Sequence, residues 1–114
     1  MGREGLGIPA RSGKLAVMLY SCAMSVDLRI PEAGSLKAKR TVVKHVVEAS
    51  RSRFAVAATE TGYLDRWQRC ELGFAAVAGD HRHVEEVLDA VERFVWSEPA
   101  IEVVAVERWW TETG

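Results

Sequence analysis

The sequence predicts an α+β fold, in which a four-stranded antiparallel sheet carries two helices on one of its faces. Apolar side chains alternate with small or polar ones in residues 18–30 and 68–78, which is the period of a strand with one buried face. Apolar residues recur at i, i+3, i+4 and i+7 over residues 84–95, as in an amphipathic helix. The chain of 114 residues, 48% of them hydrophobic, suits one packed core and is too short for two.

We expect a single domain over residues 18–110. Residues 1–17 mix Gly, Pro and Arg without periodicity, so we interpret them as a disordered leader, with Met18 as an alternative start of translation. Residues 111–114 are interpreted as a flexible tail. No apolar run approaches the roughly 18–20 residues of a membrane span, so a soluble protein without membrane contact is expected.

The first half of the domain reads as strand, helix, strand. Pro31 interrupts the first strand, and Ser35 is a suitable N-cap for the helix that follows. We expect this helix to end near Arg53 and a short strand to occupy residues 54–61. The apolar side chains that would share one face of that strand are Phe54, Val56 and Ala58.

The second half reads as strand, helix, strand. After the connection TGYLDRW, the third strand is predicted over residues 68–78. Asp80 is the expected cap of the second helix, and Pro99 closes it. The last strand is predicted over residues 100–110. Two neighbouring tryptophans near its end would lie on opposite faces, so at least one is expected to be exposed or at a subunit contact: Trp109 and Trp110.

This order of elements is the split βαβ arrangement of ferredoxin-like domains. Right-handed crossovers place both helices on one face of the sheet and leave the other face open. Small and weakly polar side chains would line that open face, which predicts a homodimer formed through it; a solvated face is the alternative. The dimer-face candidates are Ser21, Ala23, Ser25, Ala55, Ala57, Thr59, Gly73 and Ala75.

Three stretches together resemble the small bacterial YlxP-like family: VDLRIPEAGSLKAKR (26–40), ETGYLDRWQRCELG (60–73) and HVEEVLDAVERF (83–94). The resemblance covers about residues 18–110 and implies a ferredoxin-like fold without established catalytic residues. Genes of this family commonly accompany those of translation initiation and ribosome maturation factors. The resemblance therefore implies a role near the ribosome, with ribosomal RNA or maturation and translation factors as partners.

The two predicted helices carry opposite charge. Residues 35–53 hold six Lys and Arg against one Glu, whereas residues 80–98 hold six Asp and Glu against two Arg. One interpretation is structural, because helices packed side by side would pair these surfaces. Solvated pairs of this kind contribute roughly 0–1 kcal/mol each.

The position of the cations favours a second interpretation. Lys37, Lys39 and Arg40 lie near the start of the helix, where cations oppose the helix macrodipole. A bound phosphate would make this placement favourable, because it also meets the free N–H groups of the first turn. Lys39 is expected to snorkel past the end of the sheet. The candidate residues for binding an anion or RNA backbone are Ser35, Lys37, Lys39, Arg40, Lys44 and Arg51.

The connection between the second and third strands supplies another candidate surface. An aromatic residue beside two arginines can stack a base and hold a phosphate; alternatively, the tryptophan is a packing anchor and the aspartate caps the turn. Glu60 is expected to pair with Arg69 across the strands. The hairpin candidates are Asp65, Arg66, Trp67, Gln68 and Arg69, with Tyr63 beside them.

Enzymatic functions find little support in the residues. The chain has no Asn, which acylphosphatases of this fold class require, and no CxxC, which copper chaperones require. The open face lacks the aromatic residues of RNA-recognition motifs. We therefore expect no catalytic residue, metal or cofactor. The two separated cysteines suggest the cytoplasm, and the net charge of −1 argues against general DNA binding.

Three functions remain open at this stage. The first is a non-enzymatic RNA- or ribosome-associated module that uses the start of the first helix. The second is a homo-oligomeric protein-interaction module, in which the acidic second helix contacts a basic partner. The third is a small-ligand sensor that binds at a dimer seam. The acidic residues offered by the second function are Glu85, Glu86, Asp89 and Glu92.

Overall fold

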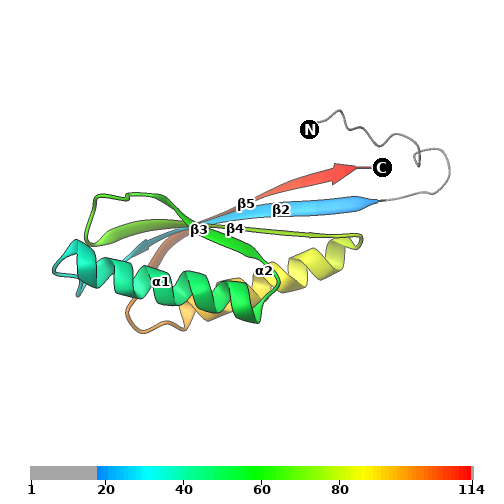
Figure 1. The fold of residues 1–114 in the computed structure, drawn as a ribbon. Coiled ribbons are helices and arrows are strands. Elements are labelled where there is room, and N and C mark those ends of the chain that lie inside the picture. Colours follow the sequence, from blue (N-terminus) through cyan, green and yellow to red (C-terminus); the bar gives the residue numbers. More distant parts are fainter. Residues whose placement is uncertain (1–17, 114) are drawn as a thin grey trace, which may run out of the picture.

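A computed structural model describes residues 18–113, which form one sheet and two helices (Figure 1). The predicted leader over residues 1–17 lies outside the described residues. The elements, in chain order, are β2 (Leu19–Arg29), α1 (Leu36–Arg53), β3 (Ala57–Gly62), β4 (Arg69–Ala78), α2 (His81–Trp96) and β5 (Glu102–Thr113).

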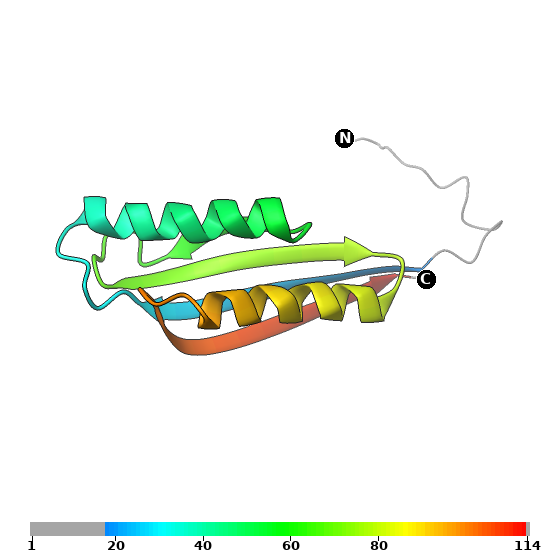
Figure 2. The same cartoon turned by 90° about the horizontal axis from the view of Figure 1, so that it is seen from below.

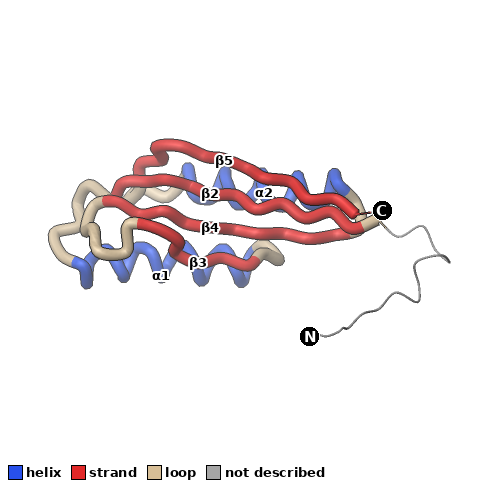
Figure 3. Tube along the Cα trace, turned by 90° about the horizontal axis from the view of Figure 1, so that it is seen from above, coloured by secondary structure: helices blue, strands red, loops and turns tan. Residues whose placement is uncertain are grey.

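The four strands form one antiparallel sheet in the order β3-β4-β2-β5. Both helices cover the same face of this sheet (Figures 1 and 2). The view from the other side shows the strands in front of the helices, with nothing over them (Figure 3). The predicted ferredoxin-like βαββαβ fold is therefore confirmed.

The core lies between the sheet and the helices. Alternate side chains of β2 are buried from Cys22 to Leu28, as the period-two pattern predicted, and Ile30 just after the strand continues the series. The apolar stripe of α2 packs onto them through four buried residues, namely Val84, Leu88, Val91 and Val95. The odd-numbered residues of β2 and β4 point to the opposite side of the sheet, which we call the open face.

Both helices begin where the capping residues predicted. The Ser35 hydroxyl accepts a hydrogen bond from the Ala38 N–H at 3.0 Å, which satisfies one of the free donors of the first turn of α1. Asp80 caps α2 by accepting from the Arg82 N–H at 3.2 Å. Local side-chain chemistry therefore set both starts.

The second predicted strand begins later than expected. Residues 54–56 do not belong to it, because Phe54 caps the end of α1 by donating its N–H to the Ser50 carbonyl at 3.0 Å. Its ring packs against Phe94 of α2, with a centroid distance of 5.8 Å. The alternation of apolar residues was thus misread at Phe54, whose partial burial comes from contact with α2.

The last strand is also displaced from its predicted bounds. It begins at Glu102 rather than at residue 100, because a turn after α2 returns the Ile101 N–H to the Glu98 carbonyl. It continues to Thr113, so residues 111–113 of the predicted tail pair with the start of β2, and residue 114 lies outside the described residues. Trp109 and Trp110 lie on opposite faces of β5, as predicted, and Trp109 is 55% exposed.

Candidate functional site

The start of α1 and the β3–β4 connection lie at the same end of the molecule, on the left in Figure 1. The Lys39 ammonium donates to the Tyr63 carbonyl at 2.6 Å, which joins the helix to the connection. The Gln68 amide donates to the Pro31 and Ala33 carbonyls, each at 3.2 Å, which joins the connection to the loop before α1. We call this region the cationic end and define it by Arg29, Lys37, Arg40, Arg66 and Arg69.

Lys39 belongs to the interior of this end rather than to its surface. Only 1% of its side chain is exposed, and its Nζ atom lies 2.8 Å from Oε2 of Glu60 in an ionic contact. The prediction that Lys39 snorkels into solvent is therefore wrong. A carboxylate and a carbonyl under the helix satisfy the ammonium where it lies, so an external anion has no access to it.

The predicted ion pair between Glu60 and Arg69 is also wrong. Glu60 lies on the helix side of β3, whereas Arg69 lies on the open face of β4. One nitrogen of the Arg69 guanidinium, Nη2, donates to both carboxylate oxygens of Asp27, at 3.0 and 2.9 Å. The Asp27 carboxylate accordingly raises the pKa of Arg69.

The remaining candidates on α1 divide into engaged and free residues. Arg51 donates from Nε and Nη2 to the Ala58 carbonyl, at 3.0 and 2.7 Å, and so ties the helix to β3. Lys37, Arg40 and Lys44 are exposed, and none of them forms an ion pair within residues 18–113. Three of the six predicted residues thus remain available to a ligand through their side chains.

Pairing between the two helices does not account for these free cations. Arg108 of β5 binds two acids of α2, Asp89 and Glu92, each at 2.9 Å. Across the part of the chain that the structure describes, the one contact of this kind between the α1 side and the α2 side joins His45 to Glu98, at 3.5 Å, and it is an ion pair only when the imidazole is protonated. The acids of α2 that form ion pairs in the described residues therefore do so with the sheet and not with α1.

A polar hollow of about 420 Å³ opens beside the β3–β4 connection. Arg66, Trp67, Gln68 and Arg69 line it, as the hairpin candidates suggested, and Asp65 is exposed nearby. Arg29 also lines the hollow, and sequence reasoning missed it. Arg29 is forty positions from Arg69 in the chain, and only the antiparallel register places the two opposite each other.

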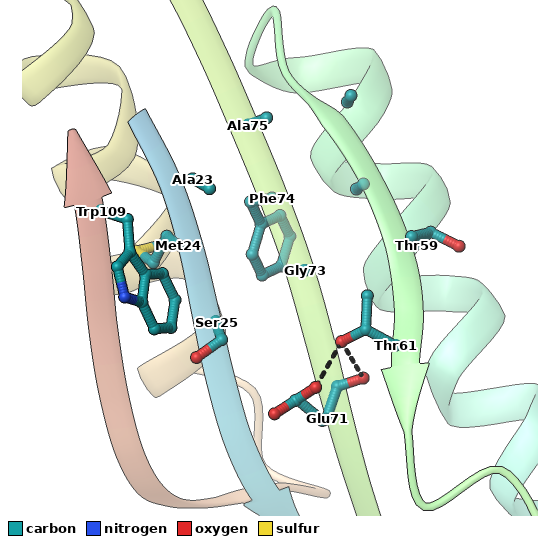
Figure 4. A pocket seen from close by; sticks show the side chains of 12 residues that line it. Ala23, Met24, Ser25, Thr59, Thr61, Glu71, Gly73, Phe74, Ala75 and Trp109 are labelled. Atoms are coloured by element: carbon teal, nitrogen blue, oxygen red, sulfur yellow. Dashed lines mark hydrogen bonds between the residues drawn. The ribbon is translucent and has the colours of Figure 1, made fainter. Parts of the chain in front are cut away.

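A second, mostly apolar hollow of about 450 Å³ lies on the open face of the sheet (Figure 4). Six of the predicted dimer-face residues line it, namely Ala23, Ser25, Ala57, Thr59, Gly73 and Ala75. Ser21 lies farther along the same face of β2, and Ala55 precedes β3. Trp109 stands at one side of the hollow, while Thr61 donates to Glu71 at 2.8 Å on the other (Figure 4).

Gly73 allows the close packing of β3 on β4 at this hollow. A Cβ atom there would lie 2.7 Å from Cγ2 of Thr61, closer than packed carbon atoms approach. Gly73 does not have a left-handed φ, so the requirement is for space beside Thr61, where the register of β3 on β4 shifts. The glycine thus leaves room for the Thr61 side chain on the open face.

The cysteines and histidines of the described residues are not arranged as a nucleophilic or metal-binding site. Burial, assisted by the charge of Glu60, raises the pKa of the Cys70 thiol to about 12, so it stays protonated and is a poor nucleophile. The His81 ring stacks on Trp110 at 3.9 Å between centroids. Within residues 18–113, no three His, Cys, Asp or Glu side chains gather as a metal site would require.

Neither described helix is long and apolar enough to cross a membrane.

Comparison with known proteins places the chain among proteins of unknown function. The model of the family described as "Protein of unknown function (DUF503)" matches residues 22–108. The curated protein "Uncharacterized protein YlxP" of Bacillus subtilis (strain 168) is 40% identical over 81 residues, covering 71% of this chain and 88% of that protein. A solved structure, "De novo designed protein Foldit4", aligns with a TM-score of 0.45 and 16% identity over 80% of this chain and 96% of its own; a likeness this distant carries no argument. The family match and the relative agree with the resemblance found in the sequence, and the chain belongs to the DUF503 family.

Proposed function

We propose that this protein is a non-enzymatic RNA-binding module that holds the phosphate backbone at its cationic end. The observation that carries the proposal is a group of exposed cations without ion pairs in the described residues, brought together from three elements: Arg29, Lys37, Arg40 and Arg66. Exposed guanidinium and ammonium groups at one end of a chain with net charge −1 make a local attraction for phosphate.

The electrostatics of α1 favour a bound anion over an empty surface. Lys37 lies in the first turn, where the helix macrodipole disfavours a cation by roughly 0.3–1 kcal/mol at low salt. No acidic residue occupies that turn to offset it. A phosphate beside the turn would interact favourably with both the cations and the remaining free N–H groups.

RNA is the proposed source of phosphate because of the family resemblance. Relatives whose genes accompany translation and ribosome maturation factors imply ribosomal RNA, or a maturation or translation factor, as a cytoplasmic partner. The free cations include both lysines and arginines, and contacts from such side chains to phosphate position a protein on RNA without reading its sequence.

The test is fluorescence polarisation with labelled ribosomal RNA fragments at two salt concentrations. Four phosphate contacts give a logarithmic salt slope of roughly −3, and the double variant Lys37→Gln/Arg40→Gln should reduce it to roughly −1.5. The matched control is Arg82→Gln/Arg93→Gln, which removes the same charge from exposed positions on α2. Lys39 is left intact, because its buried ion pair supports the fold.

Two results would contradict the proposal. In one, the wild-type protein shows no salt-dependent binding to any RNA fragment. In the other, the control variant loses as much affinity as the α1 variant, which would mean that only net charge matters.

A second candidate function is self-association through the open face. The observation that favours it is the mostly apolar hollow among exposed small residues, with the half-exposed Trp109 beside it. The small side chains of this face allow close approach of a second copy, and this would bury the indole. Homodimerisation stays a prediction, and so does a small ligand at the dimer seam.

The hypothesis that acidic residues of α2 bind a basic protein partner has fewer free charges to support it than the sequence suggested. Arg108 already binds Asp89 and Glu92, which leaves Glu85 and Glu86 as exposed acids of α2 without ion pairs in the described residues. A basic partner would meet two charges there instead of four.

A further inference from the structure

The polar hollow beside the β3–β4 connection, which we call the hairpin hollow, is lined by residues whose positions are fixed by other contacts. Its connecting segment is fixed from several directions, although it is a loop. Lys39 holds the Tyr63 carbonyl from below, and Gln68 holds two carbonyls of the loop before α1. One exposed side of the segment, carrying Trp67 and Arg66, is left uncovered.

Tyr63 provides an independent sign that this geometry is specified. Its φ angle is 58°, in the left-handed region that a bulky side chain rarely adopts. Such a conformation costs free energy and persists only where surrounding contacts hold it. The Lys39 bond fixes its carbonyl, while its ring lies 4.5 Å from the Arg69 guanidinium and its hydroxyl is 3.1 Å from Arg69 Nη2.

These contacts in turn orient Arg69. The guanidinium is held by Asp27 on one side and by Tyr63 on the other, so its position at the floor of the hollow is set before any ligand arrives. Its charge is largely neutralised by Asp27. Arg69 therefore forms part of the wall of the hollow but adds little net positive charge to it.

Arg29 and Arg66 supply the charge that is not neutralised. Arg29 stands directly opposite Arg69, and like charges opposite each other on neighbouring strands are unfavourable. Glu102 is the residue opposite Arg29 on β5, yet no ion pair joins them. Of the nearby acids, Asp27 is already bound by Arg69, and Glu102 lines an adjoining hollow of about 150 Å³ together with Arg29. Asp65 is exposed, and none of these three acids lines the polar hollow itself.

Trp67 supplies an exposed aromatic surface beside these cations. It is 51% exposed and lies between Arg66 and Gln68 at the rim. An indole left in water beside two arginines matches a nucleotide, because the base can stack on the ring while guanidinium groups bind its phosphate. A base inside a double helix is already stacked on its neighbours and cannot make this contact.

We propose that Trp67 stacks an unpaired RNA base and that Arg29 and Arg66 bind the phosphate beside it, with Arg69 and Tyr63 as positioning residues. This inference rests on the proposed RNA-binding function and narrows it to single-stranded RNA. The cations of α1 then hold the strand farther along its backbone, at the same end of the molecule.

The experiment compares a labelled single strand of about ten nucleotides, within the usual site size of one binding domain, with the same strand in a blunt duplex. Trp67→Ala should weaken binding of the single strand roughly tenfold, since one stacked base contributes that much or more, and leave the duplex unchanged. Trp67→Phe should restore most of the affinity. The matched control is Trp96→Ala, which removes a similarly exposed indole (59%) from α2.

Two further arms test the phosphate contact and the source of the ligand. Arg29→Gln/Arg66→Gln should make the single-strand salt slope shallower by roughly 1.4, the amount expected for two phosphate contacts. Adenosine monophosphate should compete only at concentrations far above those of the strand. Competition by the mononucleotide at equal concentration would overturn the assignment to an RNA strand.

The outcomes separate this inference from the function on which it rests. Equal binding of strand and duplex, unaffected by Trp67→Ala but reduced by Lys37→Gln/Arg40→Gln, would overturn the stacking site and leave the RNA-binding module standing. Absence of binding to either RNA would remove both. Loss of single-strand affinity in Trp67→Ala with no recovery in Trp67→Phe would also overturn stacking, because a benzene ring can replace an indole in that role.

Discussion

The interior and the surface of the cationic end use the same type of residue in different ways. Lys39 and Lys37 are two positions apart on α1, yet Lys39 is buried against Glu60 and Lys37 is exposed without an ion pair among residues 18–113. The structure explains the interior lysine through the fold. The surface lysine Lys37 and the nearby Arg40 form no ion pair in the described residues, so the fold does not explain their placement. A bound ligand is the better explanation for these two cations.

The largest expected effect is on the interior. Lys39→Met should lower the free energy of unfolding by on the order of 3 kcal/mol, because Glu60 would lose its partner in a mostly buried place. Urea denaturation followed by circular dichroism measures this. The double variant Lys39→Met/Glu60→Leu should recover much of the loss. A single variant as stable as the wild type would remove the distinction between the two lysines.

The second effect is a decrease in the free energy of unfolding at alkaline pH, and it arises from the buried Cys70 thiol near Glu60. Burial, with Glu60 nearby, raises the pKa of the Cys70 thiol from 9.0 to about 12 in the folded state. The unfolded chain therefore loses this proton first, and stability is retained below pH 9 and falls as pH rises towards 12. The decrease should be at most about 1.4 kcal/mol per pH unit.

Urea denaturation at several alkaline pH values measures that decrease. Cys70→Ala is the control, since other groups also titrate in this range and only the thiol's share should disappear. Identical pH profiles for the two proteins would show that the thiol is not protected by burial.

A third prediction extends the comparison to the open face. Ala75 is exposed beside the apolar hollow, so Ala75→Glu should convert the expected homodimer to a monomer, because a carboxylate would be buried unpaired at the interface. Sedimentation equilibrium measures the mass. The control is Glu85→Ala on α2, which should leave the dimer intact. A monomeric wild-type protein would end the sheet-face hypothesis.

The smallest expected effect is on the surface of the cationic end. Lys37→Gln/Arg40→Gln should change the free energy of unfolding by no more than about 0.5 kcal/mol, as is usual for exposed positions. The same urea measurement detects this. Loss of several kcal/mol would mean that these cations stabilise the fold after all, and their exposure would no longer support a ligand.

Much of the fold could be predicted from the sequence because its signals are local. The alternation along β2, the apolar stripe of α2 and the caps at Ser35 and Asp80 each depend on residues within a few positions of one another. The misplaced boundaries had non-local causes. Phe54 resembled a strand residue, although its partly buried ring packs on Phe94 of α2.

The sequence predicted the two surfaces of the candidate site but not that they lie next to each other. The sequence indicated the start of α1 and the hairpin as separate surfaces, and the structure joins them through Lys39 and Gln68. Helical periodicity placed Lys39 near the apolar side but could not supply its partner. Snorkelling was expected from that position alone, whereas the actual partner, Glu60, is some twenty positions away in the chain.

The sequence by itself determined the order of the elements, the two helix caps, the buried faces and the excess of cations on α1, since each follows from residue type and spacing. Only the tertiary structure decided which of those cations are free. Partners such as Glu60 for Lys39, Asp27 for Arg69 and Arg108 for the acids of α2 come from other elements. Strand register and helix docking bring them together, and neither leaves a mark on local spacing. The physical reason is that an ion pair depends on distance in space, whereas a sequence records only distance along the chain.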